Sequence, residues 1–145
     1  YWGDASVQVN GKLNEFYPSA KMSENDETFT LSLESYTDGW LLDKHFFIQN
    51  IPFKEGSYHF RSLIQEDGSE AMLPVFLILQ ESDNTAYNTY YLSDDNNESI
   101  VNIDKIKGDK IWGTFHMQLS NDSLKDVSAP KVYNFKLGEF KTKVL

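Results

Sequence analysis

The stretch KIWGTFHMQL, residues 110–119, decides the fold class, because apolar and polar side chains alternate along it without interruption. Strict alternation is typical of a β-strand with one buried face, since successive side chains point to opposite sides of a sheet. The predicted core face carries Ile111, Gly113, Phe115, Met117 and Leu119. The predicted outer face carries Trp112, Thr114, His116 and Gln118.

Gly113 stands in the middle of this strand, where glycine is least expected. A glycine inside a strand usually marks a sharp bend, a bulge or the close approach of another group. Gly113 lies on the core side, between Ile111 and Phe115. We therefore predict that it lets the sheet coil tightly across an aromatic core, as barrels and strongly twisted sandwiches require.

The same two-residue period recurs along the chain, and a helical 3.6-residue period is absent over any useful window. Asn10-Gly11 joins two alternating runs and favours a type I′ hairpin turn. Further strands are expected at 28–36, 43–50, 57–63, 71–80, 86–92, 99–106 and 132–144. Pro74 indicates an edge, a bulge or the start of the strand that contains it. About ten strands at roughly 8–12-residue spacing predict one all-β domain over residues 1–145, an antiparallel β-sandwich or flattened β-barrel.

Charge and composition exclude several classes of function. The chain has 145 residues, a net charge of −9 and no cysteine, which excludes disulfides, a thiol nucleophile, zinc–thiolate sites and iron–sulfur clusters. An acidic protein repels phosphate backbones, so we expect no nucleic-acid partner. The basic residues are scattered singly or alternate with other types near the end, so the sequence predicts no dense basic patch. No apolar run approaches the roughly 18–20 residues of a membrane span.

Side chains that could carry catalysis or bind metal form no recognisable motif. His45, His59 and His116 each lie in a predicted strand, at spacings that match no metal site. The acidic segments 23–27 and 93–99 lack the spacing of an EF-hand, and we expect solvated loops, with weak calcium binding at one of them as the alternative. No nucleophile elbow, phosphate loop or distinctive carboxylate pair is present. The sequence therefore predicts no enzyme, no cofactor and no resident metal.

Aromatic side chains are the best candidates for ligand contact. Trp40 lies in the turn TDGWLL, Trp112 faces away from the predicted core, and Tyr87 and Tyr91 share one face of their strand. Rings on a β-surface can stack against sugars, because their faces are apolar and their rims polar. In the competing interpretation, a neighbouring strand or loop covers Trp112 and leaves no platform.

Three segments carry a resemblance to a family. The first hairpin ASVQVNGKLNEF (5–16), the run SIVNIDKIKGDKIWGTFHMQLSND (99–122) and the end VYNFKLGEF (132–140) together resemble small all-β lipoproteins of unknown function from Bacteroidetes-type bacteria. Trp112 departs from that pattern, since the resembling strands usually carry a small polar residue there. The resemblance implies a protein of the bacterial cell envelope, in the periplasm or on the outer-membrane surface, with no known catalytic residues.

The function expected from the sequence is that of a non-catalytic, envelope-exposed binding or accessory domain. The chain begins with Tyr1 rather than methionine, so we expect a processed form whose lipid-anchoring cysteine lies upstream. Its partner is expected to be a protein or glycan at the cell envelope, with membrane contact only through the lipid anchor. Two alternatives stay open: a carbohydrate-binding module that uses the exposed aromatics, and a lipocalin-like carrier of an apolar ligand inside a barrel.

Overall fold

The computed structural model describes residues 2–36, 39–40, 42–59, 73–79, 86–92, 99–121 and 130–145, with the backbone alone for 73–79, 86–88 and 91–92. The described residues form ten strands and no helix, and hence no helix able to cross a membrane. The strands are β1 (Gly3–Val9), β2 (Lys12–Met22), β3 (Thr28–Tyr36), β4 (Leu42–Pro52), β5 (Gly56–His59), β6 (Leu73–Leu79), β7 (Ala86–Leu92), β8 (Ile100–Lys107), β9 (Lys110–Ser120) and β10 (Val132–Lys143). The all-β antiparallel fold predicted from the sequence is confirmed.

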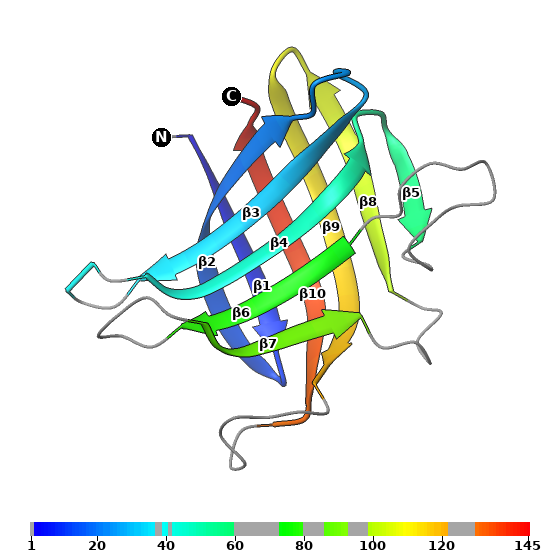
Figure 1. Ribbon diagram of the computed structural model, residues 1–145. Helices are drawn as coiled ribbons and strands as arrows, with labels where there is room; N and C mark the ends of the chain where they lie inside the picture. Colours follow the sequence, from blue (N-terminus) through cyan, green and yellow to red (C-terminus); the bar gives the residue numbers. More distant parts are fainter. Residues whose placement is uncertain are drawn as a thin grey trace.

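All ten strands belong to one antiparallel sheet that curls into a barrel-like shape (Figure 1). The strand order is β10-β1-β2-β3-β4-β6-β7-β9-β8-β5, and β10 also pairs with β9, so the path returns to its start. The seam between β7 and β9 contains only the pairs Tyr91–Ser120 and Leu92–Leu119. The β9–β10 ladder runs almost the full length of both strands and therefore carries most of the closure.

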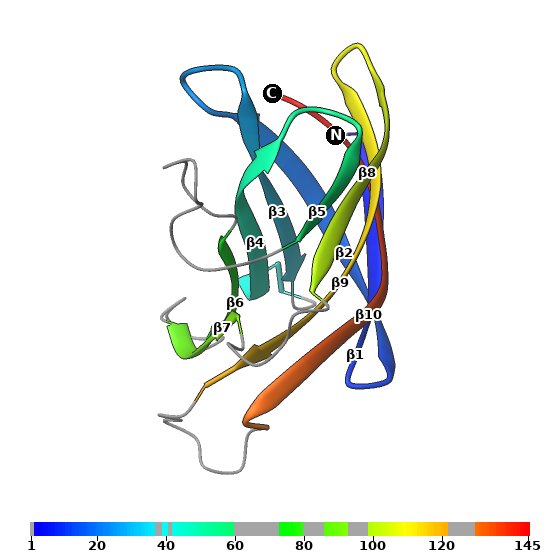
Figure 2. The ribbon, with the colours of Figure 1, turned by 90° about the vertical axis from the view of Figure 1, so that its right-hand side faces the viewer.

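The core lies between two opposed parts of this sheet. Figure 2 shows β3, β4 and β6 on one side and β8, β9, β10 and β1 on the other. Phe46 of β4 stacks on Phe115 of β9 at a centroid distance of 5.6 Å and on Phe135 of β10 at 5.1 Å. All three rings are almost completely buried, so they join the two sides through the middle of the barrel.

Two glycines fit against two phenylalanines across the β9–β10 ladder. Gly113 is paired with Phe140, and Gly138 is paired with Phe115. A Cβ atom on Gly113 would lie 2.5 Å from both the Asn102 carbonyl oxygen and Phe140 Cζ. A Cβ atom on Gly138 would lie 2.7 Å from both Phe115 Cζ and the Phe115 carbonyl oxygen. Each ring therefore occupies the space that its glycine leaves empty, an arrangement that permits close approach and strong coiling. Of the roles predicted for Gly113, close approach is observed, and the partner strand β8 also has a register shift beside it, between Ile103 and Lys105.

A bulge in β10 adds to this curvature. The register of β10 against β9 shifts between Phe135 and Gly138, and Leu137 has a φ of 54° and is 73% exposed. An extra residue in one strand bends that strand and increases the local twist. The bulge therefore lies next to the Gly138–Phe115 pair and bends the sheet where the rings need room.

Several local predictions from the sequence are confirmed. The burial of residues 110–119 alternates as predicted, with Ile111, Gly113 and Phe115 buried. Asn10 and Gly11 have φ values of 50° and 83°, as a type I′ turn requires. Pro74, for which an edge, a bulge or a strand start was predicted, is the second residue of β6, which agrees with the third of these.

We predict that Gly113→Ala lowers the free energy of unfolding by about 1–3 kcal/mol, because its Cβ atom overpacks the site against a backbone carbonyl and a buried ring. Chemical denaturation of variant and parent measures the change. Gly11→Asn is the control, because no atom lies within 4 Å of a Cβ there and asparagine tolerates positive φ. Overlapping curves for Gly113→Ala and the parent would contradict the close approach.

Candidate functional site

Three exposed aromatic rings gather where β2 and β3 meet the turn that leads to β4. Tyr17, Tyr36 and Trp40 form this aromatic cluster, and their exposed fractions are 47%, 38% and 71%. Centroid distances are 5.8 Å for Tyr17–Tyr36, 6.0 Å for Tyr36–Trp40 and 6.3 Å for Tyr17–Trp40. In this cluster a sequence-predicted candidate, Trp40, joins two other exposed rings.

Strand alternation places the two tyrosines on the outer surface. Phe16 and Pro18 of β2 are buried, so Tyr17 between them points outward. Tyr36 ends β3 two residues after Glu34, on the outer face of that strand. Trp40 follows in the turn with a φ of 61°, a region that a bulky side chain rarely occupies. The turn thus holds Trp40 beside the tyrosines in a strained backbone conformation, a feature common at binding sites.

The cluster is a compact platform rather than an open cage. The centre of a triangle with sides of 5.8–6.3 Å lies about 3.5 Å from each corner. A quaternary ammonium group stands farther than this from each ring that it contacts, because its methyl groups must fit between nitrogen and ring. The rings therefore pack on one another and offer their outward surfaces to a ligand.

Polar groups border the platform on the outer face of β3 and β4. The Tyr36 hydroxyl donates a hydrogen bond to Glu34 Oε2, and this bond, with partial burial and the Glu34 charge, raises the pKa of Tyr36 to about 12. His45 lies opposite Glu34, with its Nε2 atom 3.9 Å from Glu34 Oε1. Burial lowers the pKa of His45, and Glu34 opposes this shift in part, so the imidazole is neutral at pH 7. Glu34 therefore presents a negative carboxylate beside the rings.

A groove of about 580 Å³ runs beside the two tyrosines over β1, β2 and the end of β3. Its lining includes the carboxylates of Asp4 and Glu15 as well as Tyr17 and Tyr36. The groove adds hydrogen-bond acceptors to the aromatic surface. A ligand that contacts both would meet apolar ring faces and negative oxygens.

The other predicted tryptophan, Trp112, lies in a different environment. It is on the outer face of β9 as predicted, and it packs edge-on against Trp2 at a centroid distance of 5.8 Å. The ammonium of Lys105 lies 4.9 Å from the Trp112 centroid. Trp112 is partly covered but not shielded, and no ring contact joins it to Trp40. The two tryptophans therefore belong to separate surfaces.

The two predicted tyrosines cannot be assigned to either surface. Tyr87 and Tyr91 are in β7, and their side chains lie outside the described part of the chain. Their part in ligand contact stays a prediction.

The three histidines are distributed over β4, β5 and β9. Within the described residues, no group of three or more histidine, aspartate or glutamate side chains could hold a metal ion. In the acidic segment 23–27, Asn25 Oδ1 accepts hydrogen bonds from Ser23 and from the Glu27 backbone, so this side chain caps its own turn. Of the acidic segment 93–99, only Ser99 is described.

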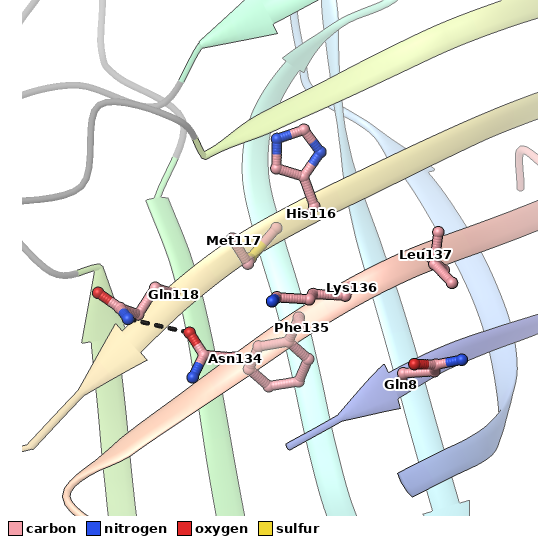
Figure 3. A pocket seen from close by; sticks show the side chains of 8 residues that line it. All are labelled: Gln8, His116, Met117, Gln118, Asn134, Phe135, Lys136 and Leu137. Atoms are coloured by element: carbon pink, nitrogen blue, oxygen red, sulfur yellow. Dashed lines mark hydrogen bonds between the residues drawn. The ribbon is translucent and has the colours of Figure 1, made fainter. Parts of the chain in front are cut away.

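A second hollow, of about 600 Å³, lies at the β10 bulge (Figure 3). Gln118 Nε2 donates to Asn134 Oδ1 at 2.9 Å, and the Asn134 backbone N–H donates to Asn10 Oδ1 at 2.8 Å. These amides tie β9, β10 and the β1–β2 turn together around the register shift. The hollow follows from the bulge, and its amides have a structural role.

Sequence reasoning missed Tyr17 and Tyr36, although a signal for each was present. Phe16-Tyr17 is a pair of adjacent aromatics in a strand, so one ring must face outward. Tyr36 shares parity with Thr30, Ser32 and Glu34, the residues predicted for the outer face of β3. What alternation alone did not indicate is that both rings meet Trp40.

Comparison of the chain with protein-family models, curated proteins and solved structures finds no match. The resemblance to small envelope lipoproteins therefore stays a prediction.

We predict that Trp40→Asn leaves the free energy of unfolding unchanged or raises it by up to about 1 kcal/mol, because asparagine adopts positive φ more readily than tryptophan. Thermal or chemical denaturation measures this. Trp112→Asn is the matched control and should destabilise the protein, since Trp112 packs against Trp2 and has no positive φ. A clear loss of stability in Trp40→Asn would show that Trp40 is needed for folding rather than for contact.

In an alkaline titration followed by phenolate absorbance, Tyr36 should lose its proton at a higher pH than an ordinary tyrosine. Its pKa is raised from 10.0 to about 12, so the stabilisation that it provides is complete below pH 10 and is lost as pH rises through about 12. Subtracting the Tyr36→Phe titration from that of the parent isolates this step. Glu34→Gln should move the step toward lower pH, because the Glu34 hydrogen bond is its largest cause. A Tyr36 step near pH 10 in the parent would contradict the bond.

Proposed function

We propose that this chain is a non-catalytic binding domain whose ligand is a neutral carbohydrate held on the aromatic cluster. The single observation that carries the proposal is the exposure of three mutually packed rings, Tyr17, Tyr36 and Trp40, on the outer surface. Burying one large aromatic side chain gains roughly 2–3 kcal/mol, and an exposed aromatic patch therefore calls for a partner.

The shape and polarity of the cluster fit a sugar ring. The axial C–H groups of a pyranose form an apolar face that an aromatic ring can cover, while its hydroxyl groups point sideways toward polar neighbours. Glu34 lies beside Tyr36, and Asp4 and Glu15 line the adjoining groove. Carboxylates accept hydrogen bonds from hydroxyl groups and make the stronger, charge-assisted kind.

The charge around the cluster selects among sugars. Glu34 and Glu15 are acidic residues at this surface, Asp4 beside them pairs with Lys141, and the whole chain carries −9. Uronic acids and sulfated sugars would be repelled from this surface, because like charges at close range weaken association. A neutral hexose, pentose or N-acetylated sugar is therefore the expected class of ligand.

The alternative of a carrier with a ligand inside the barrel has less support. Phe46 stacks between Phe115 and Phe135, so aromatic rings fill the interior of the barrel between β4, β9 and β10. Such packing leaves an apolar ligand no space between those strands. The outer surface is the better place for a ligand.

Location at a bacterial cell envelope is part of the proposal and rests on the sequence resemblance alone. An envelope-exposed domain meets glycans of its own or neighbouring surfaces, which agrees with a carbohydrate ligand. The lipid anchor is likewise proposed from the resemblance.

The test is binding to a panel of neutral polysaccharides and oligosaccharides, by retardation in polysaccharide-containing native gels followed by calorimetry. We expect at least one neutral glycan to bind and Trp40→Ala to weaken it about tenfold or more, the effect of losing an interface anchor of about 1.4 kcal/mol. Tyr36→Phe separates the ring from its hydroxyl and should have a smaller effect.

Trp2→Ala is the matched control, because Trp2 is an exposed tryptophan on the other aromatic surface and its loss should leave affinity unchanged. Loss of binding in Trp2→Ala but not in Trp40→Ala would move the site to that surface. Binding to no neutral glycan, or release of reducing ends from a bound one, would overturn the proposal.

A further inference from the structure

Antiparallel pairing gathers five lysines onto one outer face, although they are dispersed along the sequence. One row across three strands runs Lys105–Trp112–Lys141, and the next row runs Lys107–Lys110–Lys143. Residues directly opposite in a ladder have Cβ atoms about 4.5–5.5 Å apart and project from the same side of the sheet. The prediction that the bases form no dense patch is therefore wrong, because β8, β9 and β10 bring lysines from two sequence segments together. We call these two rows, with Trp2, the lysine–tryptophan face.

The row Lys107–Lys110–Lys143 is unfavourable for folding. Like charges directly opposite across a sheet destabilise it, and this row contains three in succession. Lys143 pairs with Asp109 at 3.5 Å, and Lys141 of the neighbouring row pairs with Asp4 at 3.2 Å. Among the described residues, no carboxylate pairs with Lys105, Lys107 or Lys110. A local arrangement that opposes folding in this way is typical of a functional surface.

The charge of this face is opposite to that of the molecule. Its five lysines and two aspartates sum to +3, and Glu55, which accepts a hydrogen bond from the Ile106 backbone N–H beside them, reduces this to +2, so the rest of a chain of net charge −9 carries −11. Such a polarised protein turns its basic face toward an anionic partner and its acidic remainder away from it. The bordering row contains Glu139, which ends the basic face on that side.

Two tryptophans lie within the basic face. Trp2 is 36% exposed and packs edge-on against Trp112, while Lys110 lies over the Trp2 ring at 5.0 Å and Lys105 over the Trp112 ring at 4.9 Å. Tryptophan beside lysine is the combination that favours the interfacial region of a lipid bilayer, where the ring meets the acyl boundary and the ammonium meets the headgroup phosphate.

We propose that the lysine–tryptophan face docks on an anionic lipid bilayer. The lysines lie on both sides of the tryptophans and across three strands, so the positive charge extends in two dimensions. A surface of headgroup phosphates matches this distribution better than a single polyanion chain, which would need its charges along one line. This contact is additional to the anchor expected from the sequence, and the aromatic cluster on β2 and β3 lies beyond Asp4, which pairs with Lys141 at the border between the two surfaces.

Flotation of the protein with vesicles tests the docking. Vesicles of equal parts phosphatidylglycerol and phosphatidylcholine should bind the protein at low salt, pure phosphatidylcholine vesicles should not, and added salt should release it. Lys107→Gln/Lys110→Gln should weaken binding roughly 25-fold, since a lysine near an anionic surface contributes about fivefold. The same double variant should not unfold more easily than the parent, because it removes opposed like charges.

Lys12→Gln/Lys131→Gln is the matched control, because it makes the same change of net charge at exposed lysines outside the face. In a Trp40→Phe background, quenching of tryptophan fluorescence by brominated lipids should report contact of Trp2 and Trp112 with the bilayer.

Three results would overturn the proposal. One is the absence of binding to anionic vesicles, and another is an equal loss of binding in the control variant. The third is retention on an immobilised polyanion such as dextran sulfate without vesicle binding or quenching, which would make an anionic polymer the partner.

Discussion

The structure depends on the interlocking of Gly113 with Phe140 and of Gly138 with Phe115 across the β9–β10 ladder. Each glycine lets one ring approach the backbone to a distance that no other residue permits. Of these two rings, Phe115 stacks, together with Phe135, on Phe46 from the opposite side of the barrel, and Phe140 contacts Phe115. Because the β7–β9 seam is short, curvature at the glycines and at the β10 bulge is what brings the two sides of the sheet together.

Because many aromatic rings are buried in the core, the rings that stay exposed call for a separate explanation. The inner faces of β2, β3, β4, β7, β9 and β10 all contribute buried aromatic rings to a dense core. Tyr17, Tyr36 and Trp40 are left exposed and in contact, and Trp40 adopts a strained φ to be there. An exposed ring that is also held in a costly conformation is better explained by contact with a ligand than by stability.

The two outer surfaces differ in charge and therefore in partner. The aromatic cluster is bordered by Glu34 and Glu15, which suits hydroxyl groups and repels anions, and Asp4, paired with Lys141, lies between the two surfaces. The lysine–tryptophan face is positive and extends over three strands, which suits a surface of phosphates. A domain that docks on a membrane by one face and binds a glycan on another would make both contacts without a conformational change.

The sequence by itself determined the all-β class, the Asn10-Gly11 hairpin and the inner and outer faces of residues 110–119. These follow from side-chain period and turn chemistry, which are local properties of the chain. The outward position of Trp112 was also predictable, since parity fixes which side of a sheet a residue faces. Tertiary structure alone decided which outer residues meet: Trp40 with Tyr17 and Tyr36, Trp112 with Trp2, and lysines of β8 and β9 with those of β10. The physical reason is that alternation fixes a side chain's face but not its neighbours, which depend on strand order, register and bulges set by the packing of the whole core.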